Sequence, residues 1–423
     1  MDPTPHPRKP YTIYGGEQPP PRRRRKRRGG LILVVVLVVL IAAGAAVAIV
    51  ALKPFGGADV AAGEPLPQAA QTGGPSTMPS PSATNTTPPK PAAVTITSGG
   101  DVIGGFGVSG VVASMGSGLF SSVAPSFKGS DFGFVNLESP LTTGGDAQGW
   151  KDVVIKGNPA LAPAMAKSGI NVVTMANNHA GDMGDSGLLD SIKYCEKNGI
   201  AVVGAGRNLK EAQAGVVLKT SGGASADGTL RDAKTAFLGF TDVLPIGYPA
   251  TSTSPGTSPG RADLNAVKKN IRAAAKKADY VVVGWHWNFE YKRAPSYLES
   301  SEGKAAVDAG ADLVIAHHPH LLDGVQAYHG GLIVYSLGNL VFSGFSGETA
   351  QTVLVKAKVT PRSIDAQLIP VIVSGSGVPT LADGSTGLSI LQRVKSMSAA
   401  LGTTVKIKGG RGYVHVTRTP KDE

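Results

Sequence analysis

Cysteine is nearly absent from this sequence, since Cys195 is the only one in 423 residues. A single thiol excludes an intramolecular disulfide. Cys195 falls in a stretch that is expected to be helical, 188–198, where a buried and unreactive thiol is the favoured interpretation. The folded part must therefore be held together by its apolar core, for which about 330 residues are sufficient.

Excess charge is also absent from most of the chain, although the formal net charge is +11. The first 30 residues carry nine basic and two acidic side chains, and the run 22–28 contains seven of the basic ones. The other 393 residues carry 32 basic and 28 acidic side chains, so their net charge is only +4. This distribution argues against a nucleic-acid partner, because the basicity is confined to one short segment.

Two segments lack the large apolar side chains that a packed core needs. Residues 53–92 are rich in Pro, Ser, Thr, Gly and Ala, and we interpret them as a flexible linker. Residues 1–30 are interpreted as a disordered, basic, cytoplasmic tail. Residues 93–423 are then expected to form the folded domain.

One long apolar run lies between the tail and the linker. Residues 31–52 contain no charge over 22 residues, which at about 1.5 Å per residue is enough to span a hydrocarbon core of about 30 Å. A cleaved signal peptide and a buried core helix are the alternatives, but the run is longer than a signal peptide's apolar region. The basic run 22–28 keeps the N-terminus in the cytoplasm and places anionic membrane lipids among the expected partners. The sequence thus predicts a single-pass protein of the cell membrane with an extracytoplasmic C-terminal domain.

From residue 94 onward, short β-branched runs alternate with Ala-, Lys- and Glu-rich stretches, a pattern typical of an α/β fold. Strands are expected over 94–97, 133–137, 171–176, 201–204, 235–240, 280–285, 312–316 and 332–336. Helices are expected over 159–168, 188–198, 261–278, 300–309 and 386–399. Residues 221–232 and 250–260 are expected to be surface loops.

Unusual polar side chains follow six of the expected strands. They are Gly100-Asp101, Asn136-Leu-Glu138, Asn177-Asn-His179 with Asp182, His286 with Glu290, His317-His-Pro-His320 and Gly338-Asn339. Five of the eight histidines belong to these motifs, so the clustering is strong. Because ligands bind at the carboxyl ends of strands in α/β sheets, we expect these side chains to converge on one site.

The chemistry of this set favours a divalent metal ion. Carboxylates, an amide oxygen and imidazoles, without a thiolate, suit Mn, Fe, Zn or Mg. Two such ions about 3.5–4 Å apart clamp the attacking and leaving oxygens of an in-line displacement. Single motifs have simpler explanations: Gly100-Asp101 alone is a common turn, and Glu138 alone is a helix cap. Their conjunction in one chain favours the metal site.

The order and spacing of the motifs resemble the CapA family of bacterial poly-γ-glutamate capsule synthesis proteins. The resemblance covers 94–375 and includes the patterns Asn177-Asn-His179-x-x-Asp182-x-Gly184, His286-Trp287-x-x-Glu290-Tyr291 and Tyr335-Ser-Leu-Gly-Asn339. It implies a calcineurin-like, metallophosphatase-type layered β-sandwich flanked by helices, here preceded by the single transmembrane helix. It also implies a role in the synthesis or export of a capsular or cell-envelope polymer, with poly-γ-glutamate expected.

The resemblance assigns six side chains to the metal site: Asp101, Glu138, Asn178, His286, His318 and His320. Asp101 resembles the family's first metal-binding Asp, Glu138 the carboxylate that bridges two ions, and Asn178 the metal-binding amide. His286 is similar to the isolated His ligand. The last two are similar to the closing His-x-His pair, beside which His317 is an alternative ligand.

The resemblance also implies a catalytic group. His179 resembles the general acid next to the metal, and Asp182 and Glu290 complete the expected group. Two positions depart from the pattern. Ile103 stands where metallophosphoesterases have a His, and Asn288 stands where a Gly is common, either adding a polar group to the site or capping a turn.

Two classes of function follow from the resemblance. One is a non-catalytic assembly factor that binds an anionic capsule or wall polymer and works with membrane-bound polyglutamate synthesis proteins. The other is a metal-dependent phosphoesterase or amide or peptide hydrolase that acts on an envelope polymer. The retained ligand set favours the enzyme, and Ile103 favours the assembly factor, so the sequence leaves the choice open.

Overall fold

The computed structural model describes residues 89–220 and 229–420, which belong to one compact unit, Thr87–Glu423. The predicted tail 1–30, the predicted membrane span 31–52 and nearly all of the predicted linker lie outside the described residues. Within the described ranges, no helix is both long and apolar enough to cross a membrane. The last residues of the predicted linker form the short strand β1 (Lys90–Pro91), which pairs with β8 (Leu230–Arg231).

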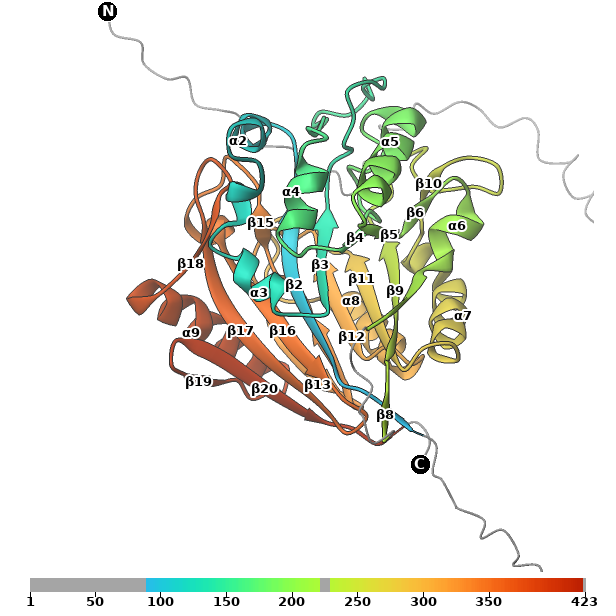
Figure 1. The fold of residues 1–423 in the computed structure, drawn as a ribbon. Helices are drawn as coiled ribbons and strands as arrows, with labels where there is room; N and C mark the ends of the chain where they lie inside the picture. Colours follow the sequence, from blue (N-terminus) through green and yellow to red (C-terminus); the bar gives the residue numbers. More distant parts are fainter. Residues whose placement is uncertain (1–88, 221–228, 421–423) are drawn as a thin grey trace, which may run out of the picture. The chain divides into compact units, whose positions relative to one another are not determined.

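Two β-sheets form the centre of the domain (Figure 1). The larger sheet has the order β19-β20-β17-β16-β2-β3-β4-β5, with β15 beside β2 and β18 beside β17. Its strands are β2 (Val94–Val102), β3 (Phe132–Leu137), β4 (Val172–Thr174), β5 (Ala201–Val203), β15 (Asn339–Val341), β16 (Gln351–Val359), β17 (Ser363–Val373), β18 (Pro379–Leu381), β19 (Lys406–Lys408) and β20 (Arg411–Thr417).

The smaller sheet has the order β13-β14-β12-β11-β9-β7. Its strands are β7 (Val216–Lys219), β9 (Lys234–Thr241), β11 (Tyr280–His286), β12 (Leu313–His317), β13 (Val325–Tyr328) and β14 (Gly331–Val334). The four central strands are parallel, and β7 and β13 are antiparallel edges. The larger sheet divides differently, because β2 to β5 are parallel whereas β16, β17, β20 and β19 are antiparallel.

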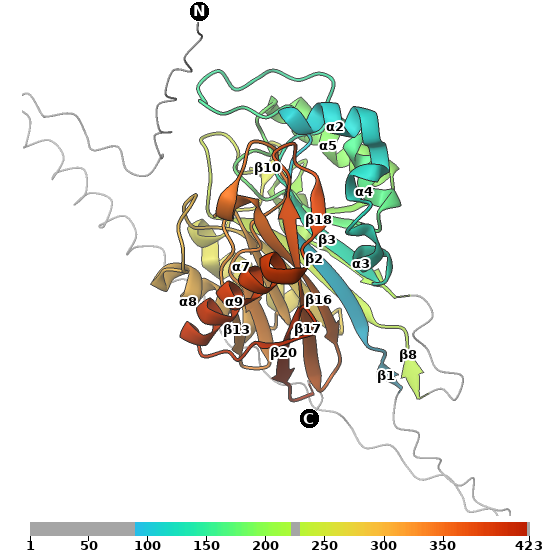
Figure 2. The same cartoon turned by 90° about the vertical axis from the view of Figure 1, so that its left-hand side faces the viewer.

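Helices cover the outer face of the smaller sheet and part of the outer face of the larger one, and Figure 2 shows α7 and α8 on one side and α3 and α4 on the other. The helices are α2 (Gly107–Met115), α3 (Ala124–Lys128), α4 (Leu161–Lys167), α5 (Gly184–Lys197), α6 (Leu209–Ala214), α7 (Leu264–Ala275), α8 (Tyr297–Asp308) and α9 (Gly384–Ala400), with 3-10 turns η1 (Gly116–Phe120), η2 (Arg261–Asp263) and η3 (Gly347–Ala350).

Three apolar clusters hold these layers together. One lies between the sheets, where the ring centroids of Phe132 and Phe237 are 5.2 Å apart. The second packs α2 to α5 against the larger sheet, and it includes Cys195, which is fully buried as expected. The third packs α7 and α8 against the smaller sheet. The parallel strands are buried on both faces, which explains why they are almost continuous apolar runs in the sequence.

The predicted α/β class is confirmed, and each of the expected strands and helices corresponds to an observed element. The expected loop 250–260 differs in containing the two-residue strand β10 (Gly256–Thr257), which pairs with β6 (Ala205–Gly206). The described part of the other expected loop contains β8. Both short strands pair with segments distant in the chain, which local turn chemistry does not reveal.

The carboxyl ends of the parallel strands of both sheets lie at the same edge of the domain. In the larger sheet, Asp101 pairs with Asn136 on β3 and with Asn339 on β15. In the smaller sheet, His286 pairs with His317 on β12. This common edge brings together side chains from strands that are up to about 240 residues apart in the sequence.

Candidate metal centre

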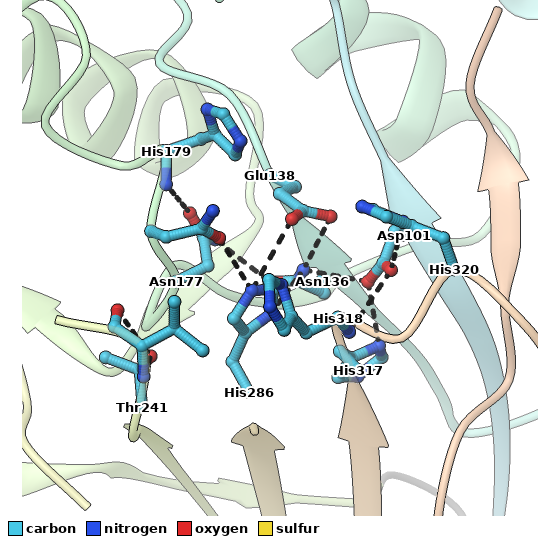
Figure 3. A network of polar contacts seen from close by, with 12 residues as sticks. Asp101, Asn136, Glu138, Asn177, His179, Thr241, His286, His317, His318 and His320 are labelled. Carbon is cyan, nitrogen blue, oxygen red and sulfur yellow. Dashed lines mark hydrogen bonds and ion pairs between the residues drawn. The ribbon is translucent and has the colours of Figure 1, made fainter. Parts of the chain in front are cut away.

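Two groups of buried side chains at this edge have the arrangement of metal ligands (Figure 3). Asp101, Glu138 and His286 form one group, and Glu138, His318 and His320 form the other. In each group the candidate ligand atoms lie within 4.8 Å of one another. Glu138 belongs to both groups, which is the position of a carboxylate that bridges two ions.

The predicted amide ligand joins the first group. Asn178 Oδ1 lies 2.8 Å from His286 Nε2, which in turn is 3.4 Å from Glu138 Oε1. Asn178 is 9% exposed and the other two are fully buried. The structure thus brings all six predicted ligand side chains to one edge of the domain.

Close backbone packing sets the position of Asp101. Its N–H donates to the carbonyl oxygen of Gly338 over 3.0 Å. A Cβ atom on the preceding residue, Gly100, would lie 2.0 Å from that same oxygen. Only glycine therefore allows β2 to approach the 338 loop closely enough to present this carboxylate.

The last two histidines of the predicted ligand set lie on a strained turn. His318 and His320 have φ angles of 98° and 53°, in the region that residues with a side chain rarely adopt. Such conformations cost about 1–3 kcal/mol each and persist where surrounding contacts determine them. Here His318 N–H donates to Asp101 Oδ2 over 3.4 Å, and His320 Nδ1 lies 2.8 Å from Asn339 Oδ1.

The partners of Asn339 fix the tautomer of His320. Asn339 Nδ2 donates to the carbonyl oxygen of Thr349 over 3.0 Å, so its Oδ1 is the acceptor that faces the ring. The Nδ1 atom of His320 is then the donor, and its Nε2 atom keeps the lone pair that a metal ligand needs.

Two asparagines that the sequence motifs contained, but to which no role was given, connect the ligands. Asn136 Nδ2 donates to Asp101 Oδ1 over 2.9 Å and lies 3.3 Å from His286 Nδ1. Asn177 Nδ2 donates to Asn136 Oδ1 over 2.9 Å, and Asn177 Oδ1 accepts from the N–H of His179 over 3.1 Å. This chain of amides orients ligands from three strands at once.

Burial and neighbouring charges shift the pKa values of Glu138 and Asp101 in opposite directions. Burial raises the pKa of Glu138 well above its usual range, and the charges of Asp101 and Glu290 raise it further. Burial acts in the same direction on Asp101, but His317 and His320 outweigh it and hold the pKa of Asp101 well below its usual range. The close contact behind this is the 3.2 Å between His317 Nδ1 and Asp101 Oδ1.

Burial favours the neutral form of two imidazoles in the cluster, and the neutral form is the one that binds a metal. Burial lowers the pKa of His286 well below its usual range, and the neighbouring His318 lowers it further. Burial also lowers the pKa of His318 to about 3. His320 is the exception, because contact with Asp101 raises its pKa in spite of burial.

The donor set fits a divalent metal ion. Among the described residues, Glu138 Oε1 and His318 Nδ1 are buried without a hydrogen-bond partner, and both residues belong to the ligand groups. Buried polar atoms are rarely left without a partner. Oxygen and imidazole nitrogen without thiolate suit Mn, Fe, Zn or Mg, and the identity of the metal is not determined by the set.

A second buried polar group adjoins the ligands. Asp182 accepts from Lys151 Nζ over 2.5 Å and from the hydroxyl of Tyr248 over 2.8 Å, and its other oxygen lies 2.7 Å from His179 Nδ1. Burial would raise the pKa of Asp182, but His179 and Lys151 outweigh it and lower it. Asp182 therefore stays ionised and holds the Nδ1–H of His179, leaving Nε2 as the free ring nitrogen.

Sequence reasoning missed Lys151 and Tyr248. Lys151 lies in a long loop after β3 without a recognisable motif, and its Nζ also donates to the carbonyl oxygen of Asn178 over 2.7 Å. Tyr248 lies in the loop after β9. An isolated Lys or Tyr in a loop gives no signal, because only the tertiary structure brings it to the site.

Two further predicted positions are less closely involved. Glu290 is half-buried, and among the described residues it forms no hydrogen bond or ion pair with the ligands, although its charge raises the pKa of Glu138. Asn288 has a φ of 71°, which Asn tolerates better than most residues, and its Oδ1 is one of the described buried atoms without a hydrogen-bond partner. Ile103 is fully buried in the apolar cluster beneath α2.

Comparison with known proteins places these residues in a family context. The family model described as bacterial capsule synthesis protein matches residues 95–344, a range that contains every predicted ligand. The PGA biosynthesis protein CapA of Bacillus subtilis is 34% identical over 259 residues, which are 61% of this chain and 65% of that protein. The capsule biosynthesis protein CapA of Bacillus anthracis is 34% identical over 270 residues, 62% of this chain and 63% of that protein.

A third relative is more distant. A probable polyglutamine synthesis accessory protein of Mycobacterium tuberculosis is 28% identical over 265 residues, 58% of this chain and 67% of that protein. The chain thus spans less than two thirds of the length of the two Bacillus relatives.

Proposed function

The chain belongs to the bacterial capsule synthesis protein family, and from this premise we propose that it serves the synthesis or export of an anionic capsular or cell-envelope polymer. The names of the Bacillus relatives refer to PGA and to capsule biosynthesis, so poly-γ-glutamate is the polymer that we propose. The proposal extends to the finer fold type: two stacked sheets with ligands at the carboxyl ends of their strands support a calcineurin-like, metallophosphatase-type domain.

One observation carries the functional proposal: the two buried ligand groups that share Glu138. In our proposal Asp101, Glu138, Asn178 and His286 hold one ion, and Glu138 with the last two histidines holds another. A bound divalent ion supplies Lewis acidity and a water of lowered pKa. Buried imidazoles and an oriented carboxylate favour the binding of such an ion. A purely structural role would not explain them, because apolar side chains would fill the same space without the cost of burying polar groups.

The second candidate function, hydrolysis of a phosphoester, amide or peptide bond in an envelope polymer, is favoured by the arrangement of His179. Its Nδ1–H is held by Asp182, so its Nε2 is the atom that carries or takes up a proton at the site. Lys151 and Tyr248 fix Asp182 from the other side. In this candidate His179 protonates the leaving group.

The membrane location is part of the proposal and rests on the sequence alone. The apolar run 31–52 after the basic run 22–28 supports a single-pass anchor with a cytoplasmic N-terminus. An extracytoplasmic domain on such an anchor would meet the polymer as it leaves the membrane. Membrane lipids and membrane-bound polymer synthesis proteins are the partners that we propose there.

Metal analysis and rescue in cells test the proposal together. The full-length chain, purified in detergent, is expected to retain a divalent metal by plasma mass spectrometry, and Asp101→Asn and His320→Ala are expected to lose it. The same variants should fail to restore the polymer in a strain that lacks the gene. The exposed His329→Asn is the matched control, expected to retain both metal and polymer.

Two results separate the candidates. If His179→Ala keeps the metal but abolishes polymer processing, the hydrolase is supported. If wild-type protein holds no metal and the ligand variants restore the polymer fully, the metal-centre proposal is wrong.

A further inference from the structure

Part of the larger sheet has an outer face that no helix within residues 89–220 and 229–420 covers. One end of the β16–β17 pair is covered. There Leu354, Ile369 and Val371 belong to the apolar cluster that also contains residues of α2 and η1. Toward the other end of the same strands, alternate side chains are exposed, and β20 repeats the pattern through Tyr413, His415 and Thr417. Figure 1 looks onto this region, where β20 and the lower parts of β16 and β17 lie in front. We call it the open face.

The open face is hollowed and polar. A hollow of about 570 Å³ is lined by Gln367, Lys406, Tyr413 and His415, among others. These side chains are linked in pairs: Gln367 Nε2 donates to the hydroxyl of Tyr413 over 3.2 Å, and His415 Nδ1 lies 2.6 Å from Asp365 Oδ1. The floor of the hollow is thus ordered by its own contacts.

Basic side chains border this floor on both sides. Lys406 and Lys408 are exposed on β19 at the edge of the sheet, and Lys358 is exposed on β16. The order β19-β20-β17-β16 separates the two borders by three strand spacings, about 14 Å. Of the described residues that line the hollow, Asp365 is the single acid, and it contacts His415 and lies opposite Lys358 on β16.

Protection of a sheet edge explains only part of this pattern. Lysines on β19 discourage pairing with another chain. That role does not explain Lys358, because this lysine lies on an interior strand. It also does not explain the hydrogen bond between Gln367 and Tyr413 in the hollow. The pattern is instead that of a surface shaped for a ligand of opposite charge, because exposed cations attract a polyanion and an aromatic ring packs against its aliphatic parts.

We propose that the open face binds an extended polycarboxylate chain, lying over Tyr413 and Gln367 between the lysine borders. This inference rests on the proposed function, because the polymer proposed there carries one carboxylate per repeat. The open face lies on the antiparallel strands, away from the strand ends that carry the metal-ligand groups. It would hold the polymer while the metal centre acts on, or passes, another part of it.

The composition of the face favours a polymer over a lipid surface. Binding to a membrane surface is strengthened by exposed large apolar side chains. Of the described residues that line the hollow, Tyr413 is the one that exposes a large apolar ring. The side chains over the floor instead offer an amide, a hydroxyl and an imidazole, which suit hydrogen bonds to a polyamide with free carboxylates.

The test is polymer binding by the full-length chain in detergent micelles. Fluorescently labelled poly-γ-glutamate of defined length is titrated against wild type and against Lys406→Glu/Lys408→Glu combined with Tyr413→Ser. We expect the variant to bind about tenfold more weakly or worse, and wild-type binding to weaken as salt is raised. Lys193→Glu/Lys269→Glu, at exposed positions on α5 and α7, matches the charge change and is expected to bind as wild type does.

The outcomes are distinct. Equal affinity of wild type and the open-face variant, with an unchanged unfolding temperature, would overturn the inference. So would loss of binding to anionic vesicles in the same variant without any loss of polymer binding, since that result assigns the face to the membrane. A third outcome concerns cells. If Asp101→Asn abolishes the polymer and the open-face variant does not, the proposed function stands but the open face is not the polymer-binding surface.

Discussion

The two halves of the larger sheet use polar side chains in opposite ways. In the parallel half, Asp101 and Glu138 are fully buried at the carboxyl ends of β2 and β3. In the antiparallel half, polar side chains of β20 alternate with buried valines and face solvent. A buried charge is tolerated only with partners in place, whereas an exposed one is solvated by water. The parallel half should therefore be sensitive to single changes and the antiparallel half tolerant.

The largest effect is expected at Gly100, where the parallel half is packed most tightly. Gly100→Ala forces a Cβ against the carbonyl oxygen of Gly338, 2.0 Å away, and should destabilise the domain by about 3 kcal/mol or more. Chemical denaturation monitored by circular dichroism measures this. The control is Gly110→Ala within α2, where an added Cβ meets nothing within 4 Å and the change should be neutral or stabilising.

Removal of the shared carboxylate is the next largest change. Glu138→Gln keeps the shape of the side chain but takes one ligand charge from both groups, so metal affinity should fall about 100-fold or more. Competition with a chromophoric chelator gives the affinity. If the variant binds as tightly as wild type, Glu138 is not a ligand and the two groups do not share it.

The amide chain should matter less than the ligands but still measurably. Asn136→Ala removes the donor that contacts Asp101 and lies beside His286, and we expect a 10- to 100-fold loss of metal affinity. Asn198→Ala, at the end of α5, removes an asparagine of the same size away from the site. An equal loss in both variants would mean that destabilisation, not ligand orientation, is responsible.

The pH dependence of stability tests the burial of polar side chains at the strand ends of the smaller sheet, which face the parallel half of the larger one. In chelator, His286 and His318 stay neutral in the folded state because burial lowers their pKa below the ordinary value of 6.5. A lowered pKa gives stability that is present above pH 6.5 and is lost as the pH falls toward about 3, because the unfolded chain binds the protons first.

Unfolding curves at several pH values test this. The double variant His286→Gln/His318→Gln should show a shallower loss of stability between pH 6.5 and pH 3 than wild type. His329→Gln, at an exposed position, should leave the wild-type slope in place. A double variant with the wild-type slope would contradict the burial of neutral imidazoles.

The smallest effect is expected on the open face. Lys406→Gln should change the free energy of unfolding by less than about 0.5 kcal/mol, because an exposed side chain contributes little to stability. The same denaturation assay as for Gly100 applies. A larger loss would remove the contrast between the halves and would show that the lysine borders support the fold itself.

Prediction from the sequence succeeded where local pattern and tertiary environment agree. The parallel strands are continuous apolar runs that end in polar motifs, so β11 and β12 and their terminal histidines are evident from the sequence. The long strands β16 and β17 were not expected at all. Pro370 lies within β17, at the point where one edge of the strand passes from pairing with β20, which ends at Leu368, to pairing with β18, which begins at Val371. A proline there removes no needed hydrogen bond, but in a sequence it argues against a strand.

The site shows the same limit. Asp101, Glu138 and the histidines are found through short motifs, because each follows directly from a buried strand. Lys151 and Tyr248 come from loops, and their contact with Asp182 depends on how those loops return to the sheet. The spacing of residues in the sequence does not predict the path of these loops.

The contact between Asp101 and the turn at His318 joins residues that are 217 positions apart. Most of the domain must be synthesised and arranged before the two meet, and contacts of such long range form slowly. If the proposed centre binds a metal ion, the ion can be captured only at the end of folding, and its binding would then stabilise the finished topology by mass action. In that case the metal that occupies the centre would depend on the ions available where folding is completed.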